Sequence, residues 1–426
     1  MSYFWNKRPL ALIHVDTFRR EYTSSWLLGE ELRKRGYRVA LTSRLSTRLI
    51  LKFLVPDAVV LSHPFTLDVD DRIKAIKKGV RFYVNIVEEV IEDQTCMEVL
   101  YRDELKVETF SGLIVWSKWS SNWVKENTNI LHERVHNFGS IRNSLLNRLV
   151  LKSDNNTIGV LSRFESLNNW DSRHQFMDIL NLDPEDYDAA DTRFYFEKKS
   201  IDAESFAIMC KLIRKLILAD KNVKIRPHPN EAIDGYKILV KEFGPKVTID
   251  RSLDVCEFLS SVDVVTGPVS SAYTEAYISG VPIVSFHNIQ KFRYSNKEVY
   301  ESLDELSECA YLPNNVEEVA GLCMAKDLEA KKSDKVDLYL DSFYSLSANP
   351  DPVSQVADLI VSEESKLSSI SRLFQRLDFI CLVFIDFLRL CQLLLKNRFS
   401  FSAMRNYHYN RLLHRPTAYL KALRRL

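Results

Sequence analysis

The chain has 426 residues, too many for one ordinary hydrophobic core, so at least two domains are expected. With 46% hydrophobic and 27% charged residues, its composition excludes a low-complexity chain and indicates a soluble globular protein. The net charge of +1 hides an asymmetry, because residues 366–426 contain twelve Lys or Arg and only two Asp or Glu. This basic tail indicates an anionic partner.

The first part of the chain, residues 1–150, predicts a Rossmann-like domain. Apolar runs predict strands at 10–15, 37–41, 58–61, 81–87, 112–116 and 135–138, and helices between them at 26–35, 73–78 and 120–127. Because strands and helices alternate, a parallel, doubly wound sheet is expected.

A second domain of the same kind is expected over residues 151–345. It has predicted strands at 157–161, 223–225 and 263–265, and a helix at 205–219. Residues 181–203, rich in Asp, Glu and Tyr, are interpreted as an insertion near the cleft and a candidate lid. Residues 346–366 are expected to form a closing helix or linker.

Two polar loops follow buried strands of the second domain. One is Arg226-Pro227-His228-Pro229, and the other ends in Ser270-Ser271 before a helix. Ligands of open α/β sheets bind at the carboxyl ends of strands, and helix N-termini favour phosphate. We therefore expect Arg226 and His228 to meet an anion from one side and Ser270 and Ser271 from the other. The alternatives are a plain turn for the Pro-His-Pro segment, a surface ion pair for Arg226 and simple helix capping for the two serines.

Three further residues are donor-site candidates. Ser162 and Arg163 follow the first strand of the second domain and should face the same crevice. Glu275 lies one turn inside the helix after Ser271, where it could bind a ribose or sugar hydroxyl or be a buried structural acid.

The first domain should supply a group that deprotonates an acceptor hydroxyl, or a nucleophile. Glu88, Glu89 and Asp16 follow predicted strands and are the catalytic candidates. Arg19 and Arg20 could bind an anionic acceptor or form a solvated helix start.

The sequence offers little sign of a metal or cofactor. No Asp-x-Asp pair stands at a strand end, so a metal-independent mechanism is expected. A P-loop and a dinucleotide fingerprint are both absent from the sequence. Its seven cysteines form no Cys-x-x-Cys pair, and the N-terminus lacks the pattern of a secretory signal, which favours a cytoplasmic setting.

The tail, residues 367–426, predicts membrane association. Within residues 377–395 the charged positions Asp378, Asp386 and Arg389 share one helical sector, and the other sector is apolar. This pattern favours a helix lying in the membrane interface, on the inner face of the cell membrane, with anionic headgroups bound by the basic residues. The alternative is packing on the body or on a second copy. Nucleic-acid binding lacks a recognisable motif.

Taken together, these motifs resemble those of bacterial surface-carbohydrate (capsule or lipopolysaccharide) biosynthesis glycosyltransferases of GT-B type. The resemblance covers most of residues 8–290 and rests on several short segments: Asp16 with the turn 18–21, Glu88-Glu89, the turn 137–142, the loop 161–168, the Arg-Pro-His-Pro-Asn-Glu run, Ser270-Ser271, Glu275-Ala276 and Gly280-Val281-Pro282.

The resemblance implies two Rossmann-like domains facing a cleft, an N-terminal one for the acceptor and a C-terminal one for the donor. The Arg-Pro-His-Pro and Ser-Ser pair is similar to the site of transferases with cytidine-activated donors, which implies phosphate contacts for His228, Ser270 and Ser271. The function implied is transfer of a sugar, with CMP-Kdo or a CMP-sialic-like acid favoured, onto a lipid-linked surface glycan. A CDP-polyol or UDP-sugar transferase, an epimerase of the same fold and a non-catalytic glycan-binding or scaffold module are the alternatives.

Overall fold

The structure is a computed structural model that describes residues 8–53, 55–87, 94–146, 156–169, 189–295, 307–344 and 351–363. These residues form two compact units. Unit 1 comprises the described residues up to 146 together with those from 339 onward, and unit 2 comprises those from 156 to 338.

Unit 1 is built on a six-stranded sheet in which every strand pair is parallel. The strands are β1 (Leu10–His14), β2 (Arg38–Thr42), β3 (Ala58–Leu61), β4 (Arg81–Asn85), β5 (Gly112–Val115) and β6 (Val135–Asn137), in the spatial order β2-β1-β3-β4-β5-β6. The strands are short apolar runs buried on both faces, as a sheet covered by helices requires.

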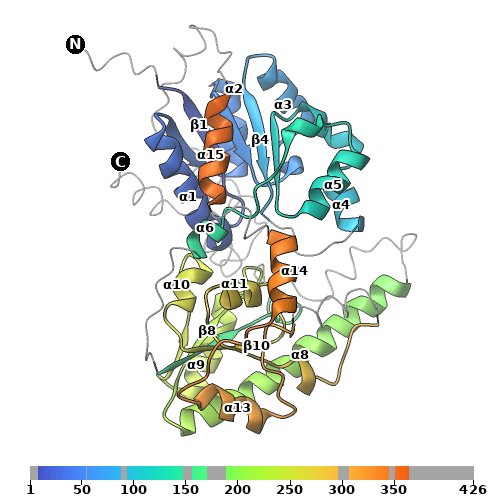
Figure 1. Ribbon diagram of the computed structural model, residues 1–426. Helices are drawn as coiled ribbons and strands as arrows, with labels where there is room; N and C mark the ends of the chain where they lie inside the picture. Colours follow the sequence, from blue (N-terminus) through green and yellow to red (C-terminus); the bar gives the residue numbers. More distant parts are fainter. Residues whose placement is uncertain are drawn as a thin grey trace, which may run out of the picture. The chain divides into compact units, whose positions relative to one another are not determined.

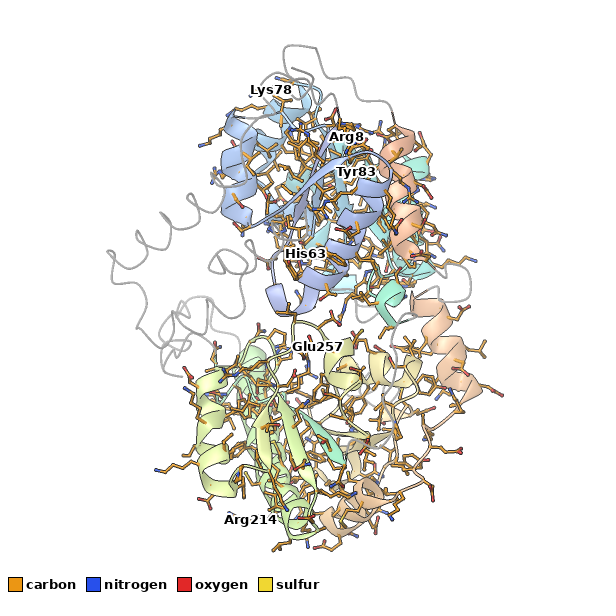
Figure 2. The ribbon with its side chains drawn as sticks, turned by 90° about the vertical axis from the view of Figure 1, so that its left-hand side faces the viewer. Arg8, His63, Lys78, Tyr83, Arg214 and Glu257 are labelled. Carbon is orange, nitrogen blue, oxygen red and sulfur yellow. The ribbon has the colours of Figure 1, made fainter. Side chains whose placement is uncertain are left out.

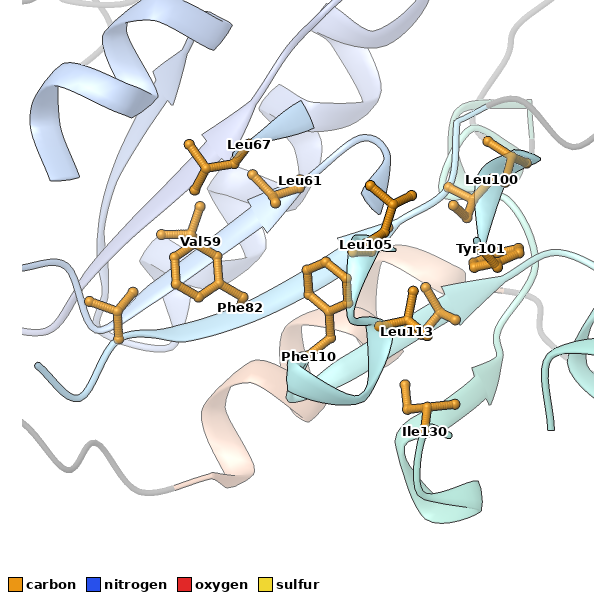
Figure 3. Close-up of a cluster of buried hydrophobic side chains, with 14 of the residues drawn as sticks. Val59, Leu61, Leu67, Phe82, Leu100, Tyr101, Leu105, Phe110, Leu113 and Ile130 are labelled. Carbon is orange, nitrogen blue, oxygen red and sulfur yellow. The ribbon is translucent and has the colours of Figure 1, made fainter. Parts of the chain in front are cut away.

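The sheet packs on one side against a large apolar core. Phe82 and Phe110 are fully buried in it, beside Val59, Leu61 and Leu113 (Figure 3). Five helices of the unit connect successive strands: α1 (Phe18–Lys34), α2 (Arg44–Phe53), α3 (Val69–Ile76), α4 (Gln94–Leu100) and α5 (Lys118–Asn127). The short helix α6 (Asn143–Leu146) follows the last strand, β6.

Helix α15 (Pro352–Ser362) returns to unit 1 from the far end of the chain and packs along α1 (Figure 1). Arg35 at the end of α1 donates to Asp358 Oδ1 and to Ser354 Oγ, both at 2.8 Å. The guanidinium of Arg81 donates to the carbonyl of Ile360 at 2.9 Å, so α15 is tied to β4 as well as to α1.

Unit 2 is built on a five-stranded sheet that is also wholly parallel. Its strands are β7 (Thr157–Leu161), β8 (Asn222–Arg226), β9 (Val247–Ile249), β10 (Val264–Gly267) and β11 (Ile283–Ser285), in the spatial order β11-β10-β7-β8-β9. The prediction of two Rossmann-like parallel sheets, the pair of domains that the GT-B plan requires, is confirmed.

The helices of unit 2 are α8 (Ala189–Leu218), α9 (Lys237–Phe243), α10 (Val255–Leu259), α11 (Ala272–Ile278), α13 (Val316–Met324) and the first part of α14 (Asp334–Tyr344). Met209, Leu212 and Leu216 of α8 are buried against the sheet together with Val319 of α13. The sequence predicted a shorter helix, from 205 to 219. The described part of the expected insertion, residues 189–203, is instead the first half of α8 (Figure 1).

Among the described residues, no helix combines the length and the apolar character needed to cross a membrane. The basic tail, residues 367–426, lies outside the described residues, so its membrane association stays a prediction.

Candidate functional site

In unit 2 the order of the strands marks where a ligand should bind. From β7 the chain proceeds outward through β8 and β9, and it then returns to the other side of β7 for β10 and β11. The loops after β7 and β10 therefore diverge at their carboxyl ends, which is the position where open α/β sheets bind ligands. The sequence-predicted donor residues 162, 163, 226, 228, 270 and 271 all lie in loops or strand ends at this edge.

Gly267, the last residue of β10, allows the two diverging loops to start close together. Its φ is +150°, and a Cβ built there would lie 2.4 Å from the carbonyl oxygen of Leu161 at the end of β7. Only glycine permits this approach of two backbones. The hydroxyl of the buried Tyr273 donates to the carbonyl of Gly267 at 2.7 Å and fixes the turn from inside.

Ser162 joins the loop after β7 to the loop after β8. Its N–H donates to the carbonyl of Arg226 at 3.1 Å. Its hydroxyl accepts the N–H of His228 at 3.2 Å and also contacts the carboxylate of Glu231. Ser162 is 4% exposed, so its role is structural: its hydrogen bonds fix the backbone path of the His228 loop.

Glu231 organises both loops from a fully buried position. Its Oε2 accepts the N–H of His228 at 2.6 Å, and its Oε1 accepts the N–H of Phe164 at 2.5 Å and the hydroxyl of Tyr236 at 2.9 Å. Burial raises the pKa of Glu231, while its hydrogen bonds and the charge of His228 act in the opposite direction. Two of the donors are backbone N–H groups, which cannot accept, so the carboxylate serves as their acceptor.

Sequence analysis gave no role to Glu231, although it stands in the Arg-Pro-His-Pro-Asn-Glu run. A usable signal was present. An acidic residue three positions after a residue that starts a turn can reach back to the backbone N–H of that residue, as in a capping box. Glu231 does this to His228.

His228 itself is paired with a carboxylate that the sequence did not single out. Its Nδ1 lies 3.0 Å from Glu165 Oε2, and Glu165 Oε1 accepts from Lys198 of α8 at 2.5 Å. Burial raises the pKa of Glu165, but hydrogen bonding and the charges of His228 and Lys198 outweigh it and hold that pKa well below its usual range. The N–H of Asn230 also lies 3.3 Å from Nδ1. The imidazole is one-third exposed, so it can meet a ligand.

Arg163 connects the same edge to the loop after β10. Its Nη1 donates to the carbonyl of Val269 at 3.3 Å, which uses one of the five N–H donors of the guanidinium. Adjacent residues of the β7 loop therefore contact both other loops, since Ser162 binds His228 and Arg163 binds Val269. The loop after β7 thus lies between the two other loops and contacts each of them, and their convergence on one ligand stays a prediction.

A second segment missed by sequence analysis, residues 290–295, lies against α8 near this edge. Glu204 Oε2 accepts the N–H groups of Lys291 and Phe292 at 2.8 and 3.0 Å. The next aromatic residue, Tyr294, interacts electrostatically with Arg163 and Glu165, and burial raises the pKa of its phenol.

Ser270 and Ser271 directly precede α11, and Glu275 lies within it. Ser270 is half-buried, and its hydroxyl accepts the N–H of Ala272 at 3.3 Å, which is the predicted capping bond. Ser271 is exposed, and its side chain makes no cap at this helix. Glu275 is 8% exposed within α11. Contact of these three residues with a donor stays a prediction.

Arg226 is engaged by the protein itself. Its Nη1 pairs with Asp250 beyond β9 and donates to Ser252 Oγ at 2.8 Å. The guanidinium also lies over the ring of Phe258, 5.6 Å from its centroid. This arrangement is the ion pair named as the alternative in the sequence, although the pair is largely buried, and a phosphate contact for Arg226 stays a prediction.

In unit 1 the order in which strands are added to the parallel sheet reverses at β1, because β2 lies on one side of it and β3 on the other. The position that corresponds to the ligand edge of unit 2 is therefore at the carboxyl ends of β1 and β3. Asp16 follows β1 there. His63 follows β3, and Figure 2 shows it at the opposite end of the sheet from Arg8. Arg19 and Arg20 lie on α1, which begins earlier than predicted. Arg20 pairs with the buried Glu21 at 3.3 Å, so it is not the solvated helix start considered from the sequence.

Two catalytic candidates, Glu88 and Glu89, lie outside the described residues, as does the side chain of Arg19. Within the ranges that the structure describes, no group of three or more His, Cys, Asp or Glu side chains could hold a metal ion. Metal independence stays a prediction.

No protein-family model matches this chain, and no curated protein matches it significantly. Several solved structures resemble it over most of its length. The wall teichoic acid polymerase TagF, in a structure with CDPG, is 16% identical, with 83% of this chain and 88% of that chain covered and a TM-score of 0.47. MnaA of S. aureus, in a structure with UDP, is 13% identical (85% and 100% covered, TM-score 0.46). A UDP-N-acetylglucosamine 2-epimerase is 13% identical (87% and 94% covered, TM-score 0.43).

Proposed function

We propose that the protein is a glycosyltransferase that binds a nucleotide-activated sugar at the β7/β10 edge of unit 2 and transfers the sugar to a hydroxyl acceptor. One observation carries the proposal. The loop after β7 contacts both the His228 loop and the loop that leads to Ser270, at the edge where the strand order reverses. This edge is the ligand position of open α/β sheets.

The side chains at this edge suit a phosphate. Arg163 has a planar fork of N–H donors, of which Val269 takes one, and such a fork binds phosphate in a bidentate manner. The Nδ1 of His228 accepts the N–H of Asn230 at 3.3 Å, which would leave Nε2 to carry the proton and to donate it to a phosphate oxygen. Glu165 lies against the imidazole, and Glu231 holds the backbone that carries it. A nucleoside diphosphate or monophosphate leaving group would gain negative charge as its bond to the sugar breaks, and these donors would stabilise that charge.

The donor that we favour is cytidine-activated, with CMP-Kdo or a CMP-sialic-like acid first. The support is the pairing of Arg-Pro-His-Pro with Ser-Ser in the sequence. The acceptor would be a lipid-linked surface glycan of a bacterial capsule or lipopolysaccharide, and the basic tail would hold the enzyme on the anionic inner face of the membrane. Asp16, Glu88 or Glu89 would act on the acceptor hydroxyl.

Thermal unfolding with a panel of free nucleotides tests the proposal. A nucleotide that binds only the folded protein raises its melting temperature, by mass action. We expect CMP or CDP to raise it above the effect of UMP, UDP and GDP, and His228→Ala to abolish the rise. His132→Ala is a matched control, because His132 is an exposed histidine of unit 1, whereas His228 belongs to unit 2.

Three results separate the alternatives. A larger shift with UDP or UMP would indicate a UDP-sugar transferase or epimerase, and product analysis with UDP-sugars would then distinguish transfer from epimerisation. A response to CDP but not to CMP would favour a CDP-polyol donor. The absence of any nucleotide response would contradict the proposed function and leave a non-catalytic glycan-binding module.

A further inference from the structure

The carboxyl-end edge of unit 1 contains a buried histidine that the proposed donor chemistry does not use. His14 is the last residue of β1 and is 3% exposed. Its Nδ1 lies 2.8 Å from the hydroxyl of Ser62, which follows β3. Its Nε2 is buried and makes no hydrogen bond to any part of the chain that the structure describes. A buried polar atom without a partner is costly, which calls for an explanation at this position.

The hydrogen bonds around His14 determine which ring nitrogen carries the proton. Ser62 Oγ donates to Glu21 Oε2 at 3.0 Å, and Glu21 also accepts the N–H groups of Asp16 and Thr17 at 2.9 and 3.0 Å. The Ser62 hydroxyl has two oxygen acceptors that cannot donate to it, the Glu21 carboxylate at 3.0 Å and, at a longer 3.4 Å, the His14 carbonyl, so its single proton is directed to one of these oxygens. Ser62 must then accept from His14, which places the imidazole proton on Nδ1. The lone pair of Nε2 is left on the side of the ring away from Ser62.

Anion binding at this edge is disfavoured by the same contacts. The carboxylate of Glu21 already occupies the N–H groups of Asp16 and Thr17 at the start of α1, and it pairs with Arg20. Burial lowers the pKa of His14 to about 4, so the imidazole is neutral near pH 7. The ionisable groups that face His14 are Glu21, Asp16, His63 and Arg44. A base this weak is poorly suited to removing a proton, but it accepts a hydrogen bond readily.

From this geometry we infer that the β1/β3 edge of unit 1 is a recognition site for a neutral polyhydroxylated molecule, a sugar or polyol, one hydroxyl of which donates to His14 Nε2. The inference rests on the proposed function in that a sugar acceptor would bring this hydroxyl. It changes the expectation from the sequence, which gave Arg19 and Arg20 an anionic acceptor. The recognition element is a lone pair held in place by Ser62 and Glu21, and Arg20 supports Glu21.

Nitrogen-15 NMR of the histidine side chains in the full chain tests the arrangement without any transferase assay. We expect His14, assigned by loss of its signals in His14→Gln, to be in the Nδ1–H tautomer and to stay neutral at pH 5. Ser62→Ala removes the acceptor of the Nδ1–H group, so the imidazole of His14 should no longer favour the Nδ1–H tautomer. Ser24→Ala should leave it unchanged, because Ser24 is as buried as Ser62 but its hydroxyl donates to the backbone carbonyl of Glu21, at 3.1 Å. An Nε2–H tautomer in the native chain would overturn the inference.

Ligand recognition is tested on the same resonances. Glycerol and methyl glucoside should shift the His14 Nε2 signal in the native chain and not in Ser62→Ala, whereas inorganic phosphate should not. A response to phosphate alone, or to none of the probes, would overturn the ligand class. These outcomes are independent of the nucleotide experiment, because the sugar probes contain no phosphate. Failure of the proposed function would show in the melting temperatures while the His14 signals still responded.

Discussion

At the scale of single residues, buried carboxylates position the candidate ligand-binding residues of both units. Glu231 holds the backbone of the His228 loop, Glu165 pairs with the imidazole, and Glu21 fixes Ser62 in the other unit. Each is largely buried and each accepts from several donors, so each favours one arrangement of its surroundings. The residues expected to touch ligands are therefore supported by acids that touch only protein.

The Glu165 pair predicts how the free energy of unfolding depends on pH. The pKa of Glu165 in the folded protein lies below its ordinary value of 4.5, so its pairing stabilises the fold above that value and the stabilisation is lost as the pH falls below it. We expect Glu165→Gln to lower the free energy of unfolding by about 1.5–3 kcal/mol at pH 7, the range for hydrogen bonds to charged groups. The deficit should shrink between pH 5 and pH 3, as measured by urea unfolding.

A matched control is Glu133→Gln, since Glu133 is exposed on a different element. Its unfolding free energy should follow that of the native chain at each pH. Parallel curves for Glu165→Gln and the native protein would contradict the role given to the Glu165 pair.

Residues at strand ends could be predicted from the sequence, but their partners could not. His228 and Ser162 follow apolar runs, so their place at one edge follows from the parallel topology. The partners of Arg226 and His228 are Asp250 and Glu165, which lie in other loops, and a single sequence contains no record of which loops meet. Arg20 was considered as an acceptor ligand or as part of a solvated helix start, and it lies in the first turn of α1, which begins at Phe18 after Thr17, whose side chain makes no capping bond.

At the scale of elements, the site of unit 2 depends on how closely β10 approaches β7. Gly267 has positive φ and leaves no room for a Cβ beside the Leu161 carbonyl. We expect Gly267→Ala to destabilise the protein by at least about 1–3 kcal/mol, the range for residues held in strained backbone conformations. The nucleotide-induced rise in melting temperature should be lost as well, because the loops would separate.

Gly321 in α13 supplies the control. A Cβ there meets nothing within 4 Å, and the position is helical. Gly321→Ala should therefore be neutral or stabilise the protein by about 0.5–1 kcal/mol, and it should leave nucleotide binding intact. Equal behaviour of the two variants in chemical unfolding would refute the close approach of β10 and β7.

The predicted strands agree with the observed ones to within two residues, because buried parallel strands are short apolar runs bounded by polar turns. Helix boundaries were harder. Helix α1 begins at Phe18 rather than near Trp26, and the N–H groups of Asp16 and Thr17 at its start are bound by Glu21 of its own first turn, while the Thr17 side chain makes no capping bond. Helix α8 begins at Ala189, in a polar segment whose residues bond to other loops, such as Lys198 to Glu165. Tertiary contacts of this kind leave no periodic pattern in the sequence.

At the scale of the whole molecule, removal of the basic tail tests membrane association. A chain shortened at residue 366 keeps Glu363, whose Oε2 accepts from the hydroxyl of Tyr83 at 2.9 Å, so α15 should stay in place. We expect the full chain to sediment with vesicles of anionic lipid and the shortened chain to remain in solution, because each Lys or Arg near such a surface contributes about 1 kcal/mol. Both chains should melt at similar temperatures.

Vesicles of neutral lipid are the control for charge, and little binding of either chain is expected. Equal sedimentation of the two chains with anionic vesicles would show that the tail is not the membrane-binding segment. A change of the full chain from dimer to monomer on shortening, without vesicle binding by either, would favour the alternative role of the tail in oligomerisation.

The return of α15 to unit 1 has a consequence for biosynthesis. Unit 1 is interrupted in the sequence by all of unit 2, and its closing helix contacts α1 through Arg35 and β4 through Arg81. A ribosome adds about 5–20 residues per second, so the first 147 residues must wait roughly 10–40 s for that helix to emerge. The described residues of unit 2, from 156 to 338, all precede α15 in the sequence and can fold before that helix is made. The nascent N-terminal third would meanwhile expose the surface against which Val353, Val356 and Ile360 of α15 are buried in the folded chain.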